Sequence, residues 1–319
     1  MKRIGLLTTG GDAPGMNAAI RAVVRYAASR DVEVIGFFRG WWGLINEDLK
    51  TLGPRSVSGI INQGGTILKT ARCPEFMTAE GRKRSLETLK KNEISGLIVI
   101  GGNGSFRAAH EFFLEHKIPC ICIPASIDND INGIDTTIGS DTAINTALAA
   151  IDNIRDTATS MERIFVVEVM GRESGFIALQ VALAGGCEDA VIPEHKFDLE
   201  SACHDIVNGN IRGKASWIIV VAEGAGSALD IAKKITEMTG LETRTVVLGH
   251  VQRGGRPTAF SRILALRLGQ AAVEYLLNGQ MDKAVYYKDG EIAAIDLKYA
   301  IIKKELKADN LYNAVKVLT

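Results

Sequence analysis

The chain has 319 residues, of which 46% are hydrophobic and 23% charged, the balance of a folded globular protein. Its 37 Lys and Arg residues equal its 37 Asp and Glu residues, so the formal net charge is zero. This balance argues against a polybasic nucleic-acid binder and against a highly charged disordered chain. Aromatic residues, at 6%, provide little material for stacking on bases, and no nucleic-acid partner is expected.

The five cysteines are odd in number and form no CxxC pair, which argues against a disulfide framework or a zinc site and favours a reducing compartment. No apolar stretch reaches the roughly 18–20 residues that a membrane span needs. The N-terminus enters a strand-like run at once, so no signal peptide is expected. The sequence therefore predicts a cytoplasmic protein without a membrane partner.

Short apolar runs that are typical of β-strands alternate with longer segments of helical periodicity. The predicted strands span residues 4–8, 32–38, 96–100, 119–123, 163–170, 190–192, 217–223 and 245–251. The predicted helices span residues 16–28, 141–156, 176–184, 228–238 and 259–277, with another that follows the third strand to about 114 and an amphipathic stretch at the end. Apolar strands that alternate with helices are typical of parallel sheets covered on both faces, so the predicted fold class is α/β. Two lobes are plausible, although no linker marks a boundary.

Two glycine-rich loops each follow a predicted strand and precede a predicted helix. The first contains Gly10, Gly11 and Gly15, and the second contains Gly101, Gly102 and Gly104. Glycines at such turns expose backbone N–H groups, and the following helix N-terminus favours anions. Neither loop is a Walker A motif, and a tight turn is the simpler interpretation of either alone. As a pair at strand ends they are a stronger sign of phosphate binding.

A third loop, residues 124–130, follows another apolar strand and carries Asp128 and Asp130. One of two acids spaced in this way can accept a proton from a hydroxyl while the other helps hold a metal. An Asx-turn cluster is the alternative interpretation, and the position at a strand end favours function.

Further polar groups gather near the ends of the later strands. They are Met170, Gly171, Arg172, Glu223, His250 and Arg253, with Arg163 and Arg244 at the starts of two strands. Arginine binds phosphate through two parallel hydrogen bonds, so several such groups suit a phosphorylated ligand.

With these motifs the chain resembles the bacterial 6-phosphofructokinases of the A family. The matching stretches are residues 10–20, 64–76, 127–130, 167–172 and 248–255, and the similarity extends over nearly the whole length. The resemblance implies two Rossmann-like α/β lobes with largely parallel sheets covered by helices. It assigns residues 1–139 and 251–302 to a nucleotide-binding lobe, and 140–250 and 303–319 to a sugar-phosphate-binding lobe.

The resemblance also implies an activity: Mg²⁺-dependent transfer of the ATP γ-phosphoryl group to the 1-hydroxyl of fructose 6-phosphate, in glycolysis. Asp128 would be the base, and Arg172 would stabilise charge on the moving phosphoryl group. The implied nucleotide-binding residues are Gly11, Arg72, Cys73, Gly102, Asn103, Gly104 and Ser105, and the implied metal ligands are Asn103 and Asp130. The implied substrate-binding residues are Ser126, Asp128, Asp130, Arg163, Met170, Gly171, Arg172, Glu223, Arg244, His250 and Arg253. Arg163 and Arg244 would come from a neighbouring subunit, which implies a homotetramer.

A separate effector site for ADP or phosphoenolpyruvate is implied as well. Arg21 and Arg25 are spaced i, i+4 and share one helix face, which alone would be a solvated surface. The resemblance adds Arg55, Arg155, Glu188, Arg212, Gly213 and Lys214 to this site.

Some residues depart from the family's pattern. Asn103 stands where the family has an Asp matched to Mg²⁺, and Ala125-Ser126 replaces Gly-Thr. Ala108, residues 161–163 and residues 175–176 depart as well. An amide is a weaker ligand for a hard cation than a carboxylate.

These departures leave alternatives open. The preferred interpretation is a working ATP-dependent kinase with altered kinetics, and the alternative is a weakly active or inactive paralogue that binds effectors. Pyrophosphate as the donor is less favoured, because such relatives typically carry Asp at the position of Gly104 and Lys at that of Ala125.

Overall fold

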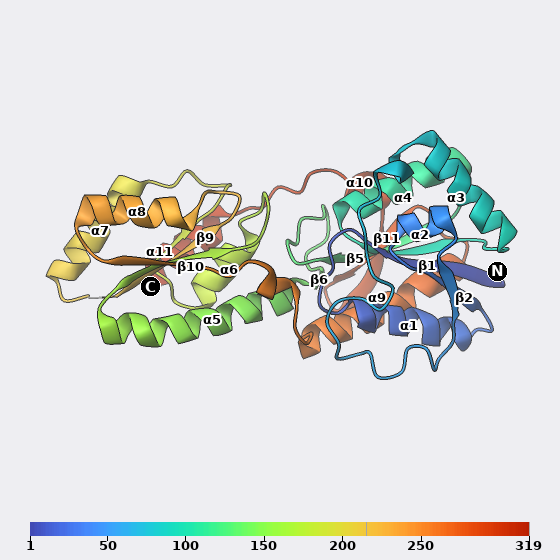
Figure 1. Cartoon of the computed structure of the whole chain (residues 1–319), viewed down its shortest axis with the longest axis horizontal. Helices are drawn as coiled ribbons and strands as arrows, with labels where there is room; N and C mark the ends of the chain where they lie inside the picture. Colours follow the sequence, from blue (N-terminus) through green and yellow to red (C-terminus); the bar gives the residue numbers. More distant parts are fainter. Residues whose placement is uncertain (215, 319) are drawn as a thin grey trace. The chain divides into compact units, whose positions relative to one another are not determined.

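The structure, a computed structural model, describes residues 1–214 and 216–318. It divides into two compact units (Figure 1). Unit 1 comprises Met1–Thr142 and Arg253–Lys304, and unit 2 comprises Ala143–Gln252 and Glu305–Thr319. These bounds differ by a few residues from the predicted lobes, and the ligand of each unit stays a prediction. None of the helices in the described part of the chain combines the length and apolar character that a membrane span requires.

Unit 1 contains a sheet of order β12-β11-β5-β4-β1-β2-β3, with β6 beside β5. Its strands are β1 (Arg3–Thr9), β2 (Glu33–Phe37), β3 (Leu49–Leu52), β4 (Leu97–Gly101), β5 (Cys120–Ser126), β6 (Ile138–Gly139), β11 (Lys283–Lys288) and β12 (Glu291–Asp296). β3 and β12 pair antiparallel at the two edges, and the other pairings are parallel. The central strands β1 and β4 are almost wholly buried, as continuous apolar runs require in a sheet covered on both faces.

Helices cover both faces of this sheet (Figure 1). α1 (Met16–Ala28) and α9 (Ala259–Leu277) pack together on one face, closely enough that a Cβ on Gly269 would lie 2.6 Å from Ala22 Cβ. The other face carries α2 (Trp41–Asn46), the 3₁₀ helix η1 (Pro74–Met77), α3 (Ala79–Lys91), α4 (Asn103–His116) and α10 (Leu297–Ala300). There Phe76 stacks on Trp41 with ring centroids 4.0 Å apart, and an apolar core joins the helices to the strands.

Unit 2 contains a wholly parallel sheet of order β10-β7-β9-β8. Its strands are β7 (Ile164–Val169), β8 (Asp189–Val191), β9 (Trp217–Ala222) and β10 (Thr243–Val247). Its helices are α5 (Ser140–Met161), which begins in unit 1, α6 (Phe176–Ala184), α7 (Leu199–Ile211), α8 (Ala228–Thr239) and α11 (Asp309–Leu318). α7 and α8 lie on one face of the sheet, and α5 and α6 lie on the other (Figure 1).

The predicted α/β class with largely parallel sheets is confirmed, and the predicted helices 16–28, 176–184 and 259–277 match α1, α6 and α9. The strand predicted over residues 245–251 is wrong at its end. β10 stops at Val247, and the chain turns at Gly249 (φ +52°) into the 3₁₀ helix η2 (Gly249–Arg253). The sequence also gave no prediction of α3, α7 or the antiparallel β11–β12 pair.

Candidate active site

Three predicted loops lie at one edge of the unit 1 sheet. The parallel register pairs Thr9 of β1 with Gly101 of β4, and Gly101 with Pro124 of β5. The three strands therefore end side by side. From β1 the chain first adds β2 on one side and later β4 on the other, so this edge holds a topological switch point, where α/β sheets bind ligands.

The first two loops are in direct contact. Ser105 Oγ donates a 3.0 Å hydrogen bond to Thr9 O, and Ser105 is buried. A Cβ on Gly101 would lie 2.5 Å from both Thr9 O and Ser105 Oγ, so only glycine fits there. α4 begins directly afterwards, at Asn103, and the first N–H groups of a helix lack partners within it. This arrangement suits a phosphate group.

The third loop holds the two acids through one hydroxyl. Ser126 Oγ donates to Asp130 Oδ1 at 3.1 Å and accepts the Asp128 N–H at 3.2 Å. Asp128 is 2% exposed. Thr137 Oγ1 donates to Ser126 O at 2.5 Å, which ties the far end of the loop back to the end of β5. The Ser126 hydroxyl thus fixes the geometry of the acidic loop.

Arg253, predicted to hold the sugar phosphate, lies on the first glycine loop of unit 1. Its Nη1 donates to Asp12 O at 3.0 Å. A Cβ on Gly11 would lie 2.5 Å from the same nitrogen, so glycine at this position makes room for the guanidinium.

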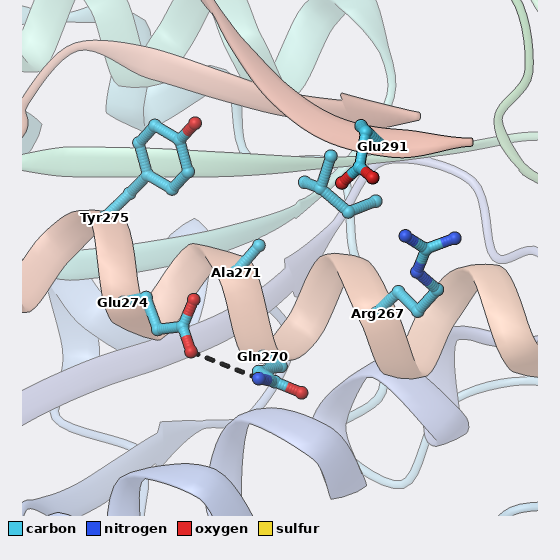
Figure 2. Close-up of a pocket in the computed structure, with 7 residues that line it drawn as sticks. Arg267, Gln270, Ala271, Glu274, Tyr275 and Glu291 are labelled. Carbon is cyan, nitrogen blue, oxygen red and sulfur yellow. Dashed lines mark hydrogen bonds between the residues drawn. The ribbon is translucent and has the colours of Figure 1, made fainter. Parts of the chain in front are cut away.

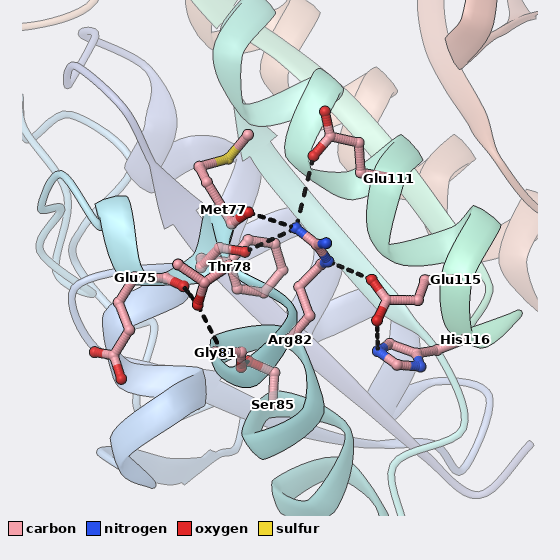
Figure 3. A network of polar contacts seen from close by, with 10 residues as sticks. Glu75, Met77, Thr78, Gly81, Arg82, Ser85, Glu111, Glu115 and His116 are labelled. Atoms are coloured by element: carbon pink, nitrogen blue, oxygen red, sulfur yellow. Dashed lines mark hydrogen bonds and ion pairs between the residues drawn. The ribbon is translucent and has the colours of Figure 1, made fainter.

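A network of polar contacts around Arg82 joins η1, the segment that follows Arg72 and Cys73 in the chain, to α4 (Figure 3). Arg72 is exposed, Cys73 is half-buried, and η1 follows them directly. Arg82 of α3 donates to Met77 O of η1 at 2.9 Å and pairs with Glu111 and Glu115 of α4. The network therefore joins this segment to the helix that begins at Asn103. Nothing in the sequence around Arg82 indicated this role.

In unit 2, one carboxylate organises the ends of two strands. Val169 and Ala222 are paired in the parallel register, so the residues after β7 and β9 are adjacent. Glu223 Oε1 accepts N–H groups from Gly171 at 3.2 Å and Arg172 at 2.8 Å. Arg172 has a φ of +53°, which is uncommon for a residue with a side chain. These bonds hold the backbone of the Met170–Arg172 loop in place.

Gln252 connects the end of β10 to the Met170–Arg172 loop. This residue was not identified in the sequence analysis. It is fully buried, its Oε1 accepts the Met170 N–H at 3.4 Å, and its Nε2 donates to Gly249 O at 3.1 Å. His250 is exposed beside it. The only sequence signal for Gln252 was its position inside the motif of residues 248–255.

Arg163 and Arg244 lie at the opposite, amino-terminal edge of the unit 2 sheet. Arg163 precedes β7, and Arg244 is the second residue of β10. Both pair with Glu242, Arg163 at 3.0 Å. The structure therefore does not bring them to Arg172, Glu223 and His250 within the sheet.

The predicted effector residues of unit 2 lie at the same amino-terminal edge. Glu188 is almost buried, its Oε1 lies 3.0 Å from Lys214 Nζ, and its Oε2 accepts the Ile218 N–H at 2.7 Å. Lys214 also lies 4.6 Å from the Trp217 ring centroid. Gly213 has a φ of +91° and Arg212 is exposed, so a tight turn presents this basic pair.

Arg155 approaches the same region from α5. Its guanidinium donates to Gly185 O at 2.5 Å and Gly186 O at 2.7 Å. Burial raises the pKa of the neighbouring Cys187 to about 12, which keeps this thiol protonated near neutral pH. The other predicted effector residues belong to unit 1: Arg21 and Arg25 on α1, and Arg55 in the turn after β3.

Near the glycine loops and the acidic loop of unit 1, the predicted metal ligands are the side-chain oxygens of Asn103 and Asp130. Among the described residues no cluster of three or more His, Cys, Asp or Glu side chains has the geometry of a metal site. Asn103 Oδ1 is buried and has no hydrogen-bond partner within the described part of the chain. With Asp130 on the next loop, this supplies two hard oxygen donors. Such a set fits Mg²⁺, which keeps several waters and binds substrate phosphates.

A separate hollow of about 310 Å³ lies beside α9 and β12 (Figure 2). Three of its polar side chains already have partners: Gln270 Nε2 donates to Glu274 at 3.1 Å, and Arg267 donates to Gly290 O at 2.8 Å. The hydrogen bond from Tyr26 lowers the pKa of Glu274. None of the predicted site residues lines this hollow, and we assign it no function.

Comparison with known proteins gives consistent matches along the chain. The sequence model of the Phosphofructokinase family matches residues 3–276. The chain is 53% identical to the ATP-dependent 6-phosphofructokinase of Bacillus pumilus and 51% identical to that of Bacillus subtilis, each over 319 residues and 100% of both chains.

Solved structures give the same fold. Phosphofructokinase from Saccharomyces cerevisiae superposes with a TM-score of 0.88 at 33% identity, covering 94% of this chain and 45% of the yeast chain. The chain thus spans less than half the length of that relative. Pyrophosphate-dependent phosphofructokinase from Marinobacter aquaeolei has a TM-score of 0.87 at 22% identity, covering 100% of this chain and 89% of its own, which shows a shared fold alone.

The Arg82 network generates a stability prediction. Replacing Arg82 with Met removes the donors to Met77 O and to the two glutamates, and should lower the free energy of unfolding by about 1–3 kcal/mol. Urea unfolding followed by circular dichroism measures the change. Arg107→Met, an exposed position on the same helix α4, is the matched control and should change stability by no more than about 0.5 kcal/mol. Equal effects of the two substitutions would contradict this role.

Proposed function

The chain belongs to the phosphofructokinase family, and from this premise we propose how its residues carry out the ATP-dependent 6-phosphofructokinase reaction. The reaction transfers the γ-phosphoryl group of ATP to the 1-hydroxyl of fructose 6-phosphate, giving fructose 1,6-bisphosphate in glycolysis. The observation that carries the residue assignment is the contact of the glycine loops at the switch point, with buried Asp128 on the next loop.

ATP is bound by the loops of unit 1 in this proposal. The backbone of Gly11, the start of α4 and Ser105 face the phosphates, while Arg72 bridges them and Cys73 lies alongside. Gly104 leaves room for the nucleoside, since a Cβ there would meet no atom within 4 Å. That space, and the absence of an Asp at this position, favour ATP over pyrophosphate as the donor.

Asp128 accepts the proton of the sugar hydroxyl, and Ser126 holds its loop. The transfer has a loose transition state, so positioning and charge stabilisation supply most of the catalysis. Arg172 supplies positive charge to the moving phosphoryl group. Gly171 and Arg172 each donate a backbone hydrogen bond to Glu223, and these two bonds stabilise the uncommon backbone conformation of Arg172.

The sugar phosphate is assigned to Met170, Gly171, Glu223, His250 and Arg253, with Arg163 and Arg244 from a neighbouring subunit. The position of the two arginines supports this assignment, because they lie at the opposite edge of the sheet from Arg172. A second subunit can bring them to a phosphate that their own chain cannot. We therefore propose a homotetramer.

Mg²⁺ is the proposed metal, held by Asn103, Asp130 and the ATP phosphates. When bound it would neutralise phosphate charge. The buried, unpartnered Asn103 Oδ1 supports this, since such an atom is costly unless a ligand satisfies it.

ADP or phosphoenolpyruvate is the proposed effector, bound by Arg21, Arg25, Arg55, Arg155, Glu188, Arg212, Gly213 and Lys214. The glycine turn that presents Arg212 and Lys214 supports this proposal, because it lies at the amino-terminal edge of the unit 2 sheet, opposite the edge that holds Arg172 and Glu223.

A cytoplasmic location is proposed for the chain. All five cysteines are free thiols. Burial raises the pKa of Cys120 and Cys122, which makes them unreactive core residues suited to a reducing compartment.

The role of Asp128 is tested by Asp128→Asn, which keeps the shape and removes the basic carboxylate. Turnover at saturating substrates should fall by about 10²–10⁴-fold, as general-base removal typically costs, with little change in KM. Steady-state kinetics measure this. Asp31→Asn is the control, because Asp31 is exposed and has a φ of +56°, which Asn tolerates. Near-wild-type turnover of Asp128→Asn would show that the base assignment is wrong.

The metal assignment predicts a gain from Asn103→Asp. The substitution is nearly isosteric, adds a carboxylate at the unpartnered position, and places negative charge in the first turn of α4, where the helix dipole favours it. The Mg²⁺ concentration for half-maximal activity should fall by about tenfold, and turnover should rise if the site is compromised. Unchanged Mg²⁺ dependence would place the metal elsewhere. Reduced turnover would mean that Ala125 and Ser126 have adapted the site to an amide.

The effector assignment is tested by combining Arg25→Ala with Lys214→Ala. Loss of two cationic groups should weaken binding of ADP or phosphoenolpyruvate by about 100-fold or more, since each charged hydrogen bond contributes about 1.5–3 kcal/mol. Isothermal titration calorimetry measures this directly. Lys234→Ala, at an exposed position of α8, is the control for the change in charge. An unchanged titration of the double variant would refute the assignment.

A further inference from the structure

The acidic loop after β5 rests on the last segment of unit 1. Lys304 Nζ donates to Asn129 O at 2.9 Å and to Ile134 O at 2.7 Å. The two carbonyls belong to opposite ends of the turn that follows Asp128. One ammonium group therefore closes this turn.

Neighbouring contacts run along the same two segments. Asn132 Nδ2 donates to Tyr299 O at 3.1 Å, and Ile131 forms an antiparallel bridge with Lys303. A Cβ on Gly133 would lie 2.6 Å from the Ile295 side chain and 2.8 Å from Tyr299. The loop thus packs on the segment of residues 295–304 along its length, and Lys304 supplies a charged contact to it.

The backbone next to Asp128 needs such support. Asn129 has a φ of +50°, an uncommon conformation for a residue with a side chain. Its Nδ2 donates to Asp135 O at 2.8 Å, while its own carbonyl oxygen receives Lys304. The direction of the Asp128 side chain depends on this peptide, because Asn129 is its immediate neighbour.

Lys304 is half-buried where it makes these contacts. Burial lowers its pKa, and the carboxylates of Asp135 and Asp130 oppose that shift. A charged donor makes stronger hydrogen bonds to carbonyl oxygens than a neutral one. The ammonium group faces the loop that holds both proposed active-site acids.

We propose that Lys304 is a positioning residue for phosphoryl transfer, which closes the turn of residues 129–134 and thereby holds Asp128 in its working geometry. The inference rests on the proposed role of Asp128. Lys304 acts through the loop backbone and does not itself contact the substrate.

The test compares Lys304→Met, Lys304→Gln and Lys304→Arg in the full-length protein, with Lys307→Met at an exposed position as the control for charge. Small misplacement of a catalytic group can cost about 100-fold, so kcat of Lys304→Met should fall by about 10–100-fold. The KM values for both substrates should change by less than about threefold, since the residue affects positioning rather than binding. Lys304→Arg should recover most of kcat, because its guanidinium can donate to both carbonyls.

Hydrogen exchange of the loop gives a readout that does not depend on turnover. The amides of residues 129–135 should exchange faster in Lys304→Met and at the wild-type rate in Lys307→Met. Lys304→Gln, which keeps a neutral donor, takes the place of the Met variant if the latter does not fold. Unchanged kcat, or a loss confined to KM, would overturn the proposal, as would unchanged exchange. If wild-type protein lacked turnover, the proposed function would fail instead, and exchange alone would decide whether Lys304 holds the loop.

Discussion

The parallel pairing of β4 with β1 and β5 determines the position of every catalytic group proposed in unit 1. Parallel strands end at the same edge, so the loops after Thr9, Gly101 and Ser126 are brought together although they are far apart in sequence. Ser105 Oγ then joins two of these loops by its hydrogen bond to Thr9 O. Two further sets of contacts hold the loops at this edge. The Arg82 network joins η1 to α4, and Lys304 bonds to the loop after β5.

The same constraint divides the groups of unit 2 into two sets. Residues that follow β7, β9 and β10 gather at the carboxyl edge, where Glu223 and Gln252 hold the backbone. Residues that precede β7, β8 and β9, including Arg163, Glu188 and Lys214, gather at the amino edge. A single parallel sheet thereby separates Arg172, Glu223 and His250 from the proposed effector residues of unit 2 and from the two arginines assigned to a neighbouring subunit.

The sequence predicted most of the elements that form these edges. Helix α1 carries a clear apolar face, and buried strands such as β4 are continuous apolar runs. The hairpin of β11 and β12 has mixed burial and no such signal. The site residues came from motifs and resemblance, whereas Lys304 lies 175 residues from Asn129, and no local pattern indicates a contact at that separation.

The central claim is that the carboxyl edge of the unit 1 sheet binds ATP, whose γ-phosphoryl group is transferred to fructose 6-phosphate. It is tested most directly by a coupled assay of the purified protein with fructose 6-phosphate and Mg²⁺, comparing ATP with pyrophosphate as the donor. We predict formation of fructose 1,6-bisphosphate with ATP and not with pyrophosphate. Turnover with pyrophosphate alone, or with neither donor, would contradict the account.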